Sequence, residues 1–219
     1  MKSEGVCKYC NKTYSAQAMA RHLLSCAERK DSLAKNQNQD FQDKVFLIRA
    51  GADPFFLYFE VNAISTLKDV DSFLREIWLE CCGHLSSFKI ENVNYDSSRS
   101  VEIFVGSKSK TMGAQLRRVL KSGLTFSHEY DFGSTTYLDL KVISERLGWL
   151  KDIEVIARNN LPDFKCECGE PAKEICAECV YEGEGLLCEK CAKEHECGEE
   201  MLLPLVNSPR TGVCGYTGD

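Results

Sequence analysis

Cysteine thiolates are strong zinc ligands, and this sequence concentrates them. It holds 13 cysteines in 219 residues, and seven lie with one histidine between positions 166 and 197. The N-terminal MKSEGVCKYC lacks the apolar stretch of a signal peptide, and no run of about 18 apolar residues predicts a membrane span. We therefore expect a cytoplasmic protein without a membrane partner. Disulfides rarely persist in that reducing compartment, so this many thiols predict metal binding.

The rear segment has the spacing of a module that binds two zinc ions. It reads Cys166-x-Cys168-x7-Cys176-x2-Cys179-x8-Cys188-x2-Cys191-x3-His195-x-Cys197. If alternate pairs share an ion, one zinc takes Cys166, Cys168, Cys188 and Cys191, and the other takes Cys176, Cys179, His195 and Cys197. The alternative is that neighbouring pairs share an ion. Cys214 is a further candidate that can replace His195 or Cys197.

The alternate pairing resembles B-box and related cross-braced folds. Apolar residues are few in this segment, so metal binding would supply the folding free energy. All four ligands of each ion come from the protein, which leaves no coordination position for a substrate. We therefore predict structural rather than catalytic zinc.

A second ligand set stands at the front as Cys7-x2-Cys10-x11-His22-x3-Cys26. Two thiolates three positions apart can face one ion, and a histidine and a ligand four positions later lie on one side of a helix. Tyr14, Met19 and Leu23 would form the small core that the metal closes. The set resembles the Cys-Cys-His-Cys variety of zinc finger, although the loop before the histidine is one residue shorter than usual. We predict three Zn²⁺ ions per chain.

The charge is distributed unevenly along the chain. Residues 1–35 hold seven Lys or Arg against three acids, whereas residues 162–200 hold four Lys against twelve acids. The basic front can contact phosphates, so nucleic acid is one candidate partner. The acidic rear should repel phosphates, so a protein partner is expected there. The candidate nucleic-acid contacts are Lys8, Lys12, Arg21, Arg29 and Lys30; the oligomeric state is left open.

Between these ends lies a middle region of mixed α and β character. The polar stretch 31–43 predicts a linker after a finger at 1–30, and NNLPDF marks the end of a domain over 44–160, before a module at 161–219. Strands are predicted at 44–50, 55–61, 88–90, 101–105, 124–130, 135–143 and 153–157, with helices at 67–81 and 114–121. Thr66 and Asp69 predict a capping box. The fold class is α+β: a central mixed sheet with helices and a β-grasp-like ββα opening, flanked by two small zinc-binding modules.

Two blocks of the middle region carry a family resemblance. Gly83, His84, Leu85 and Phe88 follow a Leu-rich helix, and Tyr130-Asp-Phe-Gly133 comes later. In this order the blocks resemble the plasmid pRiA4b ORF-3-like family of prokaryotic plasmids and mobile elements. Typical members continue with Asp-x-Trp-x-His, where this chain has Ser134, Thr136 and Leu138. The resemblance implies a link to plasmid or mobile-element biology but no particular reaction.

The alternative function is an enzyme that uses a groove on the middle domain around Cys82, His84, His128 and Asp131. Cys81, Cys82 and His84 are close enough in sequence for a thiol–imidazole pair. The simpler interpretation is a helix end with buried thiols. His128 alternates with apolar residues on a strand, which favours packing. The sequence therefore favours a zinc-binding interaction protein without catalytic residues.

Overall fold

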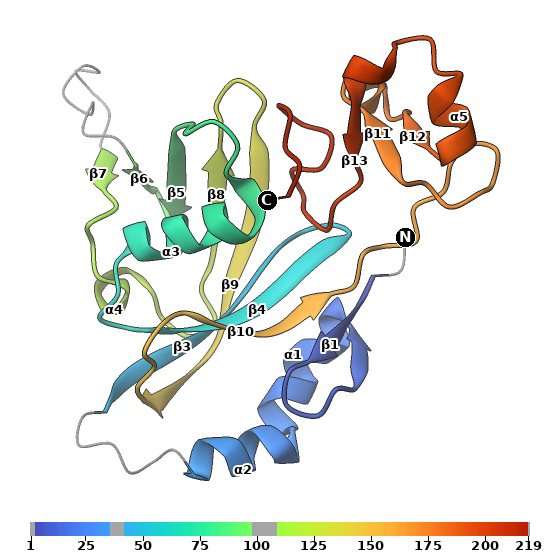
Figure 1. Cartoon of the computed structure of the whole chain (residues 1–219). Coiled ribbons are helices and arrows are strands. Elements are labelled where there is room, and N and C mark those ends of the chain that lie inside the picture. The colour runs from blue at the N-terminus through green and yellow to red at the C-terminus, as the bar shows by residue number, and fades with distance from the viewer. Residues whose placement is uncertain (1–2, 36–41, 98–108, 219) are drawn as a thin grey trace.

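The computed structural model describes residues 3–35, 42–97 and 109–218 (Figure 1). These residues form one large sheet and one small sheet, with few helices. The large sheet runs in the order β2 (Thr13–Ser15), β1 (Glu4–Cys7), β10 (Glu154–Asn159), β4 (Phe55–Asn62), β3 (Asp43–Ala52), β9 (Thr136–Gly148), β8 (Thr125–Tyr130), β5 (Ser86–Ile90), β6 (Val93–Asp96) and β7 (Ser109–Thr111). Only the β6–β7 pair is parallel within the described residues, so the sheet is mixed. The α+β prediction is confirmed.

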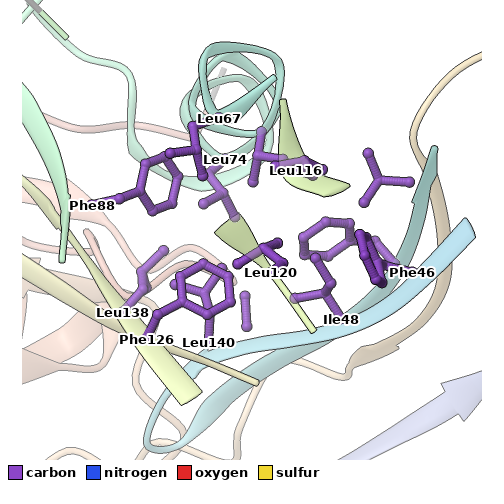
Figure 2. Close-up of a cluster of buried hydrophobic side chains, with 14 of the residues drawn as sticks. Phe46, Ile48, Leu67, Leu74, Phe88, Leu116, Leu120, Phe126, Leu138 and Leu140 are labelled. Atoms are coloured by element: carbon purple, nitrogen blue, oxygen red, sulfur yellow. The ribbon is translucent and has the colours of Figure 1, made fainter. Parts of the chain in front are cut away.

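Strand β4 contributes side chains to the packed layers on both faces of the large sheet. Every residue of this strand is buried, which fits its nearly continuous apolar run FFLYFEV. Leu57 and Phe59 point into the main core, whereas Phe56 and Tyr58 point into a second core on the opposite face. Side chains alternate across a strand, so one strand serves both layers. Figure 2 shows the main core, in which Phe46 and Ile48 from β3 meet residues of the helical layer.

Helix α3 (Leu67–Leu74) covers the main core. Thr66 and Asp69 form the predicted capping box, with the Asp69 amide donating to the Thr66 hydroxyl. The helix continues as a π-helical turn over Arg75–Leu79, which buries Trp78. The Glu80 amide then donates to the Arg75 carbonyl at 2.9 Å, and the helical path ends just before Cys81. Helix α4 (Leu116–Val119) adds Leu116 to the same core.

The opposite face of the sheet is covered by the N-terminal segment. Helix α1 (Ala16–Ser25) buries Met19 and Leu23 against Phe56, Tyr58 and Ile156. Strand β1 pairs with β10, so this segment continues the large sheet rather than standing apart from it (Figure 1). Helix α2 (Ala27–Lys35) occupies the first part of the stretch predicted as a linker; residues 36–41 lie outside the described residues.

The rear module is a small three-stranded antiparallel sheet in the order β12 (Leu186–Leu187), β11 (Glu174–Cys176) and β13 (Leu202–Pro204), with helix α5 (Glu189–Lys193) beside it. Residues 205–218, which we call the tail, leave this module and return to the middle of the protein (Figure 1). The Ser208 hydroxyl donates to the Trp78 carbonyl at 2.6 Å, and Arg210 is fully buried beside Asp131. The range 161–219 thus divides into a module and a docked tail.

Most predicted elements of the middle region occur. The predicted strands at 44–50, 55–61, 88–90, 124–130, 135–143 and 153–157 correspond to β3, β4, β5, β8, β9 and β10. Strands β8 and β9 pair with each other as an antiparallel hairpin. The predicted helix at 114–121 is shorter than expected, since only Leu116–Val119 is helical. The predicted strand at 101–105 lies outside the described residues. No helix of the described chain is long and apolar enough to cross a membrane.

Candidate metal centres

All 13 cysteines and three of the four histidines gather in four clusters. In each cluster the four potential ligand atoms lie within 4.8 Å of one another. Three clusters unite the residue sets predicted from the sequence, and the fourth was not predicted. Each cluster can therefore hold a metal ion, which is consistent with structural zinc sites.

The finger cluster consists of Cys7, Cys10, His22 and Cys26. Cys7 ends β1, and the Asn11 amide donates to its carbonyl at 2.9 Å, which closes the knuckle. His22 lies in α1 and its Nε2 is 3.3 Å from the Cys10 sulfur. Tyr14 stacks on the His22 ring with 4.0 Å between ring centroids. The predicted core residues Met19 and Leu23 are fully buried.

The finger is bound to the sheet by polar contacts as well as by its core. The Tyr58 hydroxyl donates to the Ala16 carbonyl at 2.6 Å. Arg29 of α2 pairs with the buried carboxylate of Glu60 on β4. Arg146 of β9 donates to both oxygens of Glu60, Nη2 to Oε2 at 2.5 Å and Nε to Oε1 at 3.1 Å. One acid therefore connects the finger to two strands.

These contacts change the set of basic residues that can meet a phosphate. Arg29 is buried and its guanidinium is engaged by Glu60, so its prediction as a nucleic-acid contact is wrong. Lys8 is exposed but forms an ion pair with Glu154. Lys12, Arg21 and Lys30 are exposed. The sequence signal missed the Arg29 partner because Glu60 lies 31 positions away.

The first rear cluster joins Cys166 and Cys168 to Cys188 and Cys191. Cys188 caps the N-terminus of α5, and Cys191 lies in that helix. The Cys168 and Cys188 sulfurs are 3.6 Å apart. Backbone amides of Cys168 and Cys188 donate to the Cys166 sulfur and lower the pKa of that thiol to about 6. The fold thus prepares Cys166 to be a thiolate, the form that binds metal.

The second rear cluster joins Cys176 and Cys179 to His195 and Cys197. The Cys179 sulfur lies 3.5 Å from His195 Nε2 and 3.7 Å from the Cys197 sulfur. Burial alone would raise the pKa of Cys176, but amide hydrogen bonds and neighbouring donors outweigh it and lower the pKa to about 7. The two rear clusters use alternate ligand pairs, as in the cross-braced arrangement.

The distances inside the clusters test whether zinc fits. A tetrahedral ion with a Zn–S distance of about 2.3 Å places two sulfurs about 3.8 Å apart, and a sulfur and a nitrogen about 3.5 Å apart. The sulfur–sulfur distances of 3.6 and 3.7 Å and the nitrogen–sulfur distances of 3.3 and 3.5 Å agree with these values. A disulfide would require about 2.05 Å between sulfurs. The donor sets therefore suit zinc.

The fourth cluster, which we call the tail cluster, contains Cys81, Cys82, His84 and Cys214. Sequence reasoning offered Cys214 as a substitute for His195 or Cys197, and that interpretation is wrong because Cys214 lies with residues of the middle domain. Cys81, Cys82 and His84 are close in sequence, but their partner is 130 positions beyond His84. No short-range sequence pattern therefore predicts that the two segments meet.

In the described part of the chain, the residues predicted to line a groove, Cys82, His84, His128 and Asp131, do not share one hollow. His128 is fully buried, and its Nε2 lies 2.7 Å from the Asp71 carboxylate. The hollow that includes His84 is lined by Asp71 and Arg75 among others, but not by Cys82, His128 or Asp131. Asp131 instead pairs with Arg210 at 2.6 Å, and its carboxylate accepts a hydrogen bond from the Gly133 amide at 3.0 Å.

Comparison with known proteins gives no family assignment. No family model and no curated protein matches the chain. A solved structure of a protein of unknown function, MM3350 from Methanosarcina mazei Go1, matches 52% of this chain and 67% of its own, at 14% identity and a TM-score of 0.44. The resemblance to the pRiA4b ORF-3-like family stays a prediction.

Proposed function

We propose that this chain is a zinc-stabilised interaction protein of the prokaryotic cytoplasm whose metal sites are structural. The observation that carries the proposal is the complete ligand set in the finger cluster and in both rear clusters. Each set supplies four Cys or His side chains to one point. A tetrahedral ion held in this way has no coordination position for a substrate or a reactive water. The resemblance to the pRiA4b ORF-3-like family supports a setting in plasmid or mobile-element biology.

The surface of the rear module favours a basic protein partner. Eleven of its twelve acids between 162 and 200 are exposed. Tyr181 is 65% exposed and lies beside Glu182 and Glu184 in the sequence. An exposed aromatic ring next to carboxylates is suited to Arg or Lys, because the ring face and the acids both attract cations. We therefore propose that the partner presents an Arg- or Lys-rich segment.

The proposal that the metal ions have no free coordination position is tested with cobalt. Zinc is exchanged for Co²⁺ in the full chain, and the visible spectrum is recorded before and after cyanide or azide is added. We expect tetrahedral, thiolate-rich spectra that do not change with either anion at concentrations that leave Co²⁺ bound. A spectral shift that shows an anion entering the cobalt shell would reveal an open position, and the proposal would then fail for that site.

The partner proposal is tested with defined peptides. Binding of a fluorescent Arg-rich peptide is measured by anisotropy over a salt series, with an acidic peptide as the negative probe. We expect salt-sensitive binding that Glu182→Lys weakens several-fold. Asp139→Lys is the matched control, since Asp139 is also exposed but lies on β9, and it should leave the affinity unchanged. Equal effects of the two substitutions would contradict the assignment to the rear module.

Nucleic acid is the second candidate, favoured by the exposed Lys12, Arg21 and Lys30 of the finger. Short duplex DNA, single-stranded DNA and RNA probes are compared in the same assay. Under this function, binding weakens linearly with the logarithm of salt concentration, and Arg21→Glu reduces it. An absence of binding at low salt excludes this candidate and leaves the protein partner.

A further inference from the structure

We propose that the tail cluster is a fourth zinc site, which fastens the C-terminal tail to the middle domain. Its ligands are Cys81, Cys82, His84 and Cys214. The site is additional to the interaction function proposed above and does not depend on the identity of a partner.

The distances in the tail cluster resemble those in the other three. His84 Nε2 lies 3.4 Å from the Cys214 sulfur, and the Cys82 and Cys214 sulfurs are 4.0 Å apart. These values are close to the roughly 3.5 and 3.8 Å that a tetrahedral zinc requires. Three thiolates and one imidazole are also the composition of the finger cluster and of the second rear cluster.

The local backbone gives independent support. In each predicted cluster, one cysteine is followed by a residue with a positive φ angle: Asn11 at 56°, Gly169 at 91° and Gly198 at 85°. The tail cluster has this feature twice, in Cys82-Gly83 at 73° and Cys214-Gly215 at 68°. A left-handed residue at this place turns the chain sharply after the ligand, and glycine adopts it without steric cost. The tail cluster therefore shares with the two rear clusters a cysteine followed by a glycine of positive φ.

The groups around the ligands are arranged as they are in metal sites. Asp131 Oδ1 lies 3.6 Å from Nδ1 of His84, so the carboxylate faces one ring nitrogen while the other faces Cys214. A carboxylate behind a ligating histidine fixes its orientation. Arg210 is fully buried and its Nη2 lies 3.5 Å from the Cys81 sulfur. Three thiolates and a divalent ion carry one net negative charge, which this guanidinium, shared with Asp131, would partly offset.

An ion here would close a long loop of the chain. Cys214 comes from the tail, whereas its partners follow the end of the α3 helical path. The tail is already held by Ser208 at Trp78 and by Arg210 at Asp131. The ion adds a link between segments 130 residues apart, and loop closure of that length removes much freedom from the unfolded chain.

The tail site should also exchange its ion most readily. Each of the other three clusters has at least one buried ligand, whereas all four residues of the tail cluster are exposed or partly exposed. A chelator or an oxidant therefore reaches these sulfurs first. The site would make the attachment of the tail dependent on zinc.

Metal analysis of the reduced full chain tests the proposal. We expect four zinc ions in the wild type, three in Cys214→Ser, and four in Val213→Ser, which places the same new hydroxyl one residue away. A colorimetric chelator should remove one ion from the wild type before the others, and this rapid phase should be missing in Cys214→Ser. Circular dichroism checks that each variant is folded, and the chelator experiment on the wild type needs no variant.

Trypsin reports on the tail itself. Arg210 is the only Lys or Arg in residues 205–218, so cleavage after it releases residues 211–219. We expect slow release in the zinc-loaded wild type and in Val213→Ser, and at least tenfold faster release in Cys214→Ser or after the first ion is removed. A wild type with three ions, or a Cys214→Ser variant with the wild-type ion count, overturns the fourth site. Either result leaves the interaction function standing, because that function rests on the other three clusters.

Discussion

Glu60 offers a sharp test of how the finger is joined to the sheet. Its side chain is only 1% exposed and receives Arg29 from the finger and Arg146 from β9. Glu60→Gln keeps the shape of the side chain but removes its charge. Two guanidinium groups then face a neutral amide at a place with little access to water.

The loss of stability expected for Glu60→Gln follows from the burial of the ion pair. Removing one partner of a buried ion pair costs about 3 to 5 kcal/mol, because the remaining charge is left uncompensated. For a chain of this size, that loss corresponds to a fall in melting temperature of about 6 to 20 °C. Glu145 provides the control: it pairs with Lys44 at 2.8 Å on the same sheet, but its side chain is 37% exposed. An exposed pair contributes about 0 to 1 kcal/mol, so Glu145→Gln should have little effect.

The measurement is urea unfolding of the zinc-loaded, reduced protein, followed by tryptophan fluorescence, to which the buried Trp78 contributes. Glu60→Gln should lower the free energy of unfolding several times more than Glu145→Gln. Equal losses in the two variants would refute the idea that the buried acid holds the finger in place.

The pH dependence gives a second check on Glu60. Burial alone would raise the pKa of Glu60, but Arg146 and Arg29 outweigh it and hold the pKa below its ordinary value of 4.5. The folded protein therefore binds this proton less well than the unfolded chain. The stabilisation is present above pH 4.5 and is lost as the pH falls through the lowered pKa. The difference between wild type and Glu60→Gln should shrink in the same range.

Three further predictions concern single contacts. Gly185→Ala should weaken zinc retention by the second rear cluster. Gly185 has a φ of +87°, and an added Cβ would lie 2.9 Å from the Cβ of Cys179. A chelator titration should show one ion released earlier than in the wild type. Tyr58→Phe should cost about 1 kcal/mol in urea unfolding, since the Ala16 carbonyl loses its donor. Burial alone would raise the pKa of Asp71, but its hydrogen-bond partners outweigh burial and lower the pKa below 3.8. Asp71→Asn should therefore destabilise the protein most above that pH. Thermal melts at several pH values measure this difference.

The sequence was most informative where ligands or apolar residues repeat at short range. The Cys-x2-Cys and His-x3-Cys spacings place ligands on one turn, so the finger cluster could be predicted without a structure. The same holds for the capping box of α3 and for the β8–β9 hairpin. Their determinants lie within a few residues of one another.

Long-range contacts could not be predicted in this way. Cys214 joins the tail cluster only because Ser208 and Arg210 dock the tail on the middle domain. Arg29 was predicted to contact nucleic acid, because nothing near it in the sequence indicates its ion pair with Glu60. The nearly continuous apolar sequence of β4 is typical of a strand covered on both faces, but it does not indicate that the finger covers one of them.

The pairing of β1 with β10 has a consequence for the order of synthesis. The finger leaves the ribosome well before its partner strand β10, which ends at Asn159. Metal can close the finger early, because its four ligands all lie within the first 26 residues. The cover over the apolar side of α1, with Met19 and Leu23, is complete only when Ile156 of β10 has joined Phe56 and Tyr58 of β4. A growing chain can therefore carry a metal-closed finger whose apolar face is only partly covered until β10 emerges.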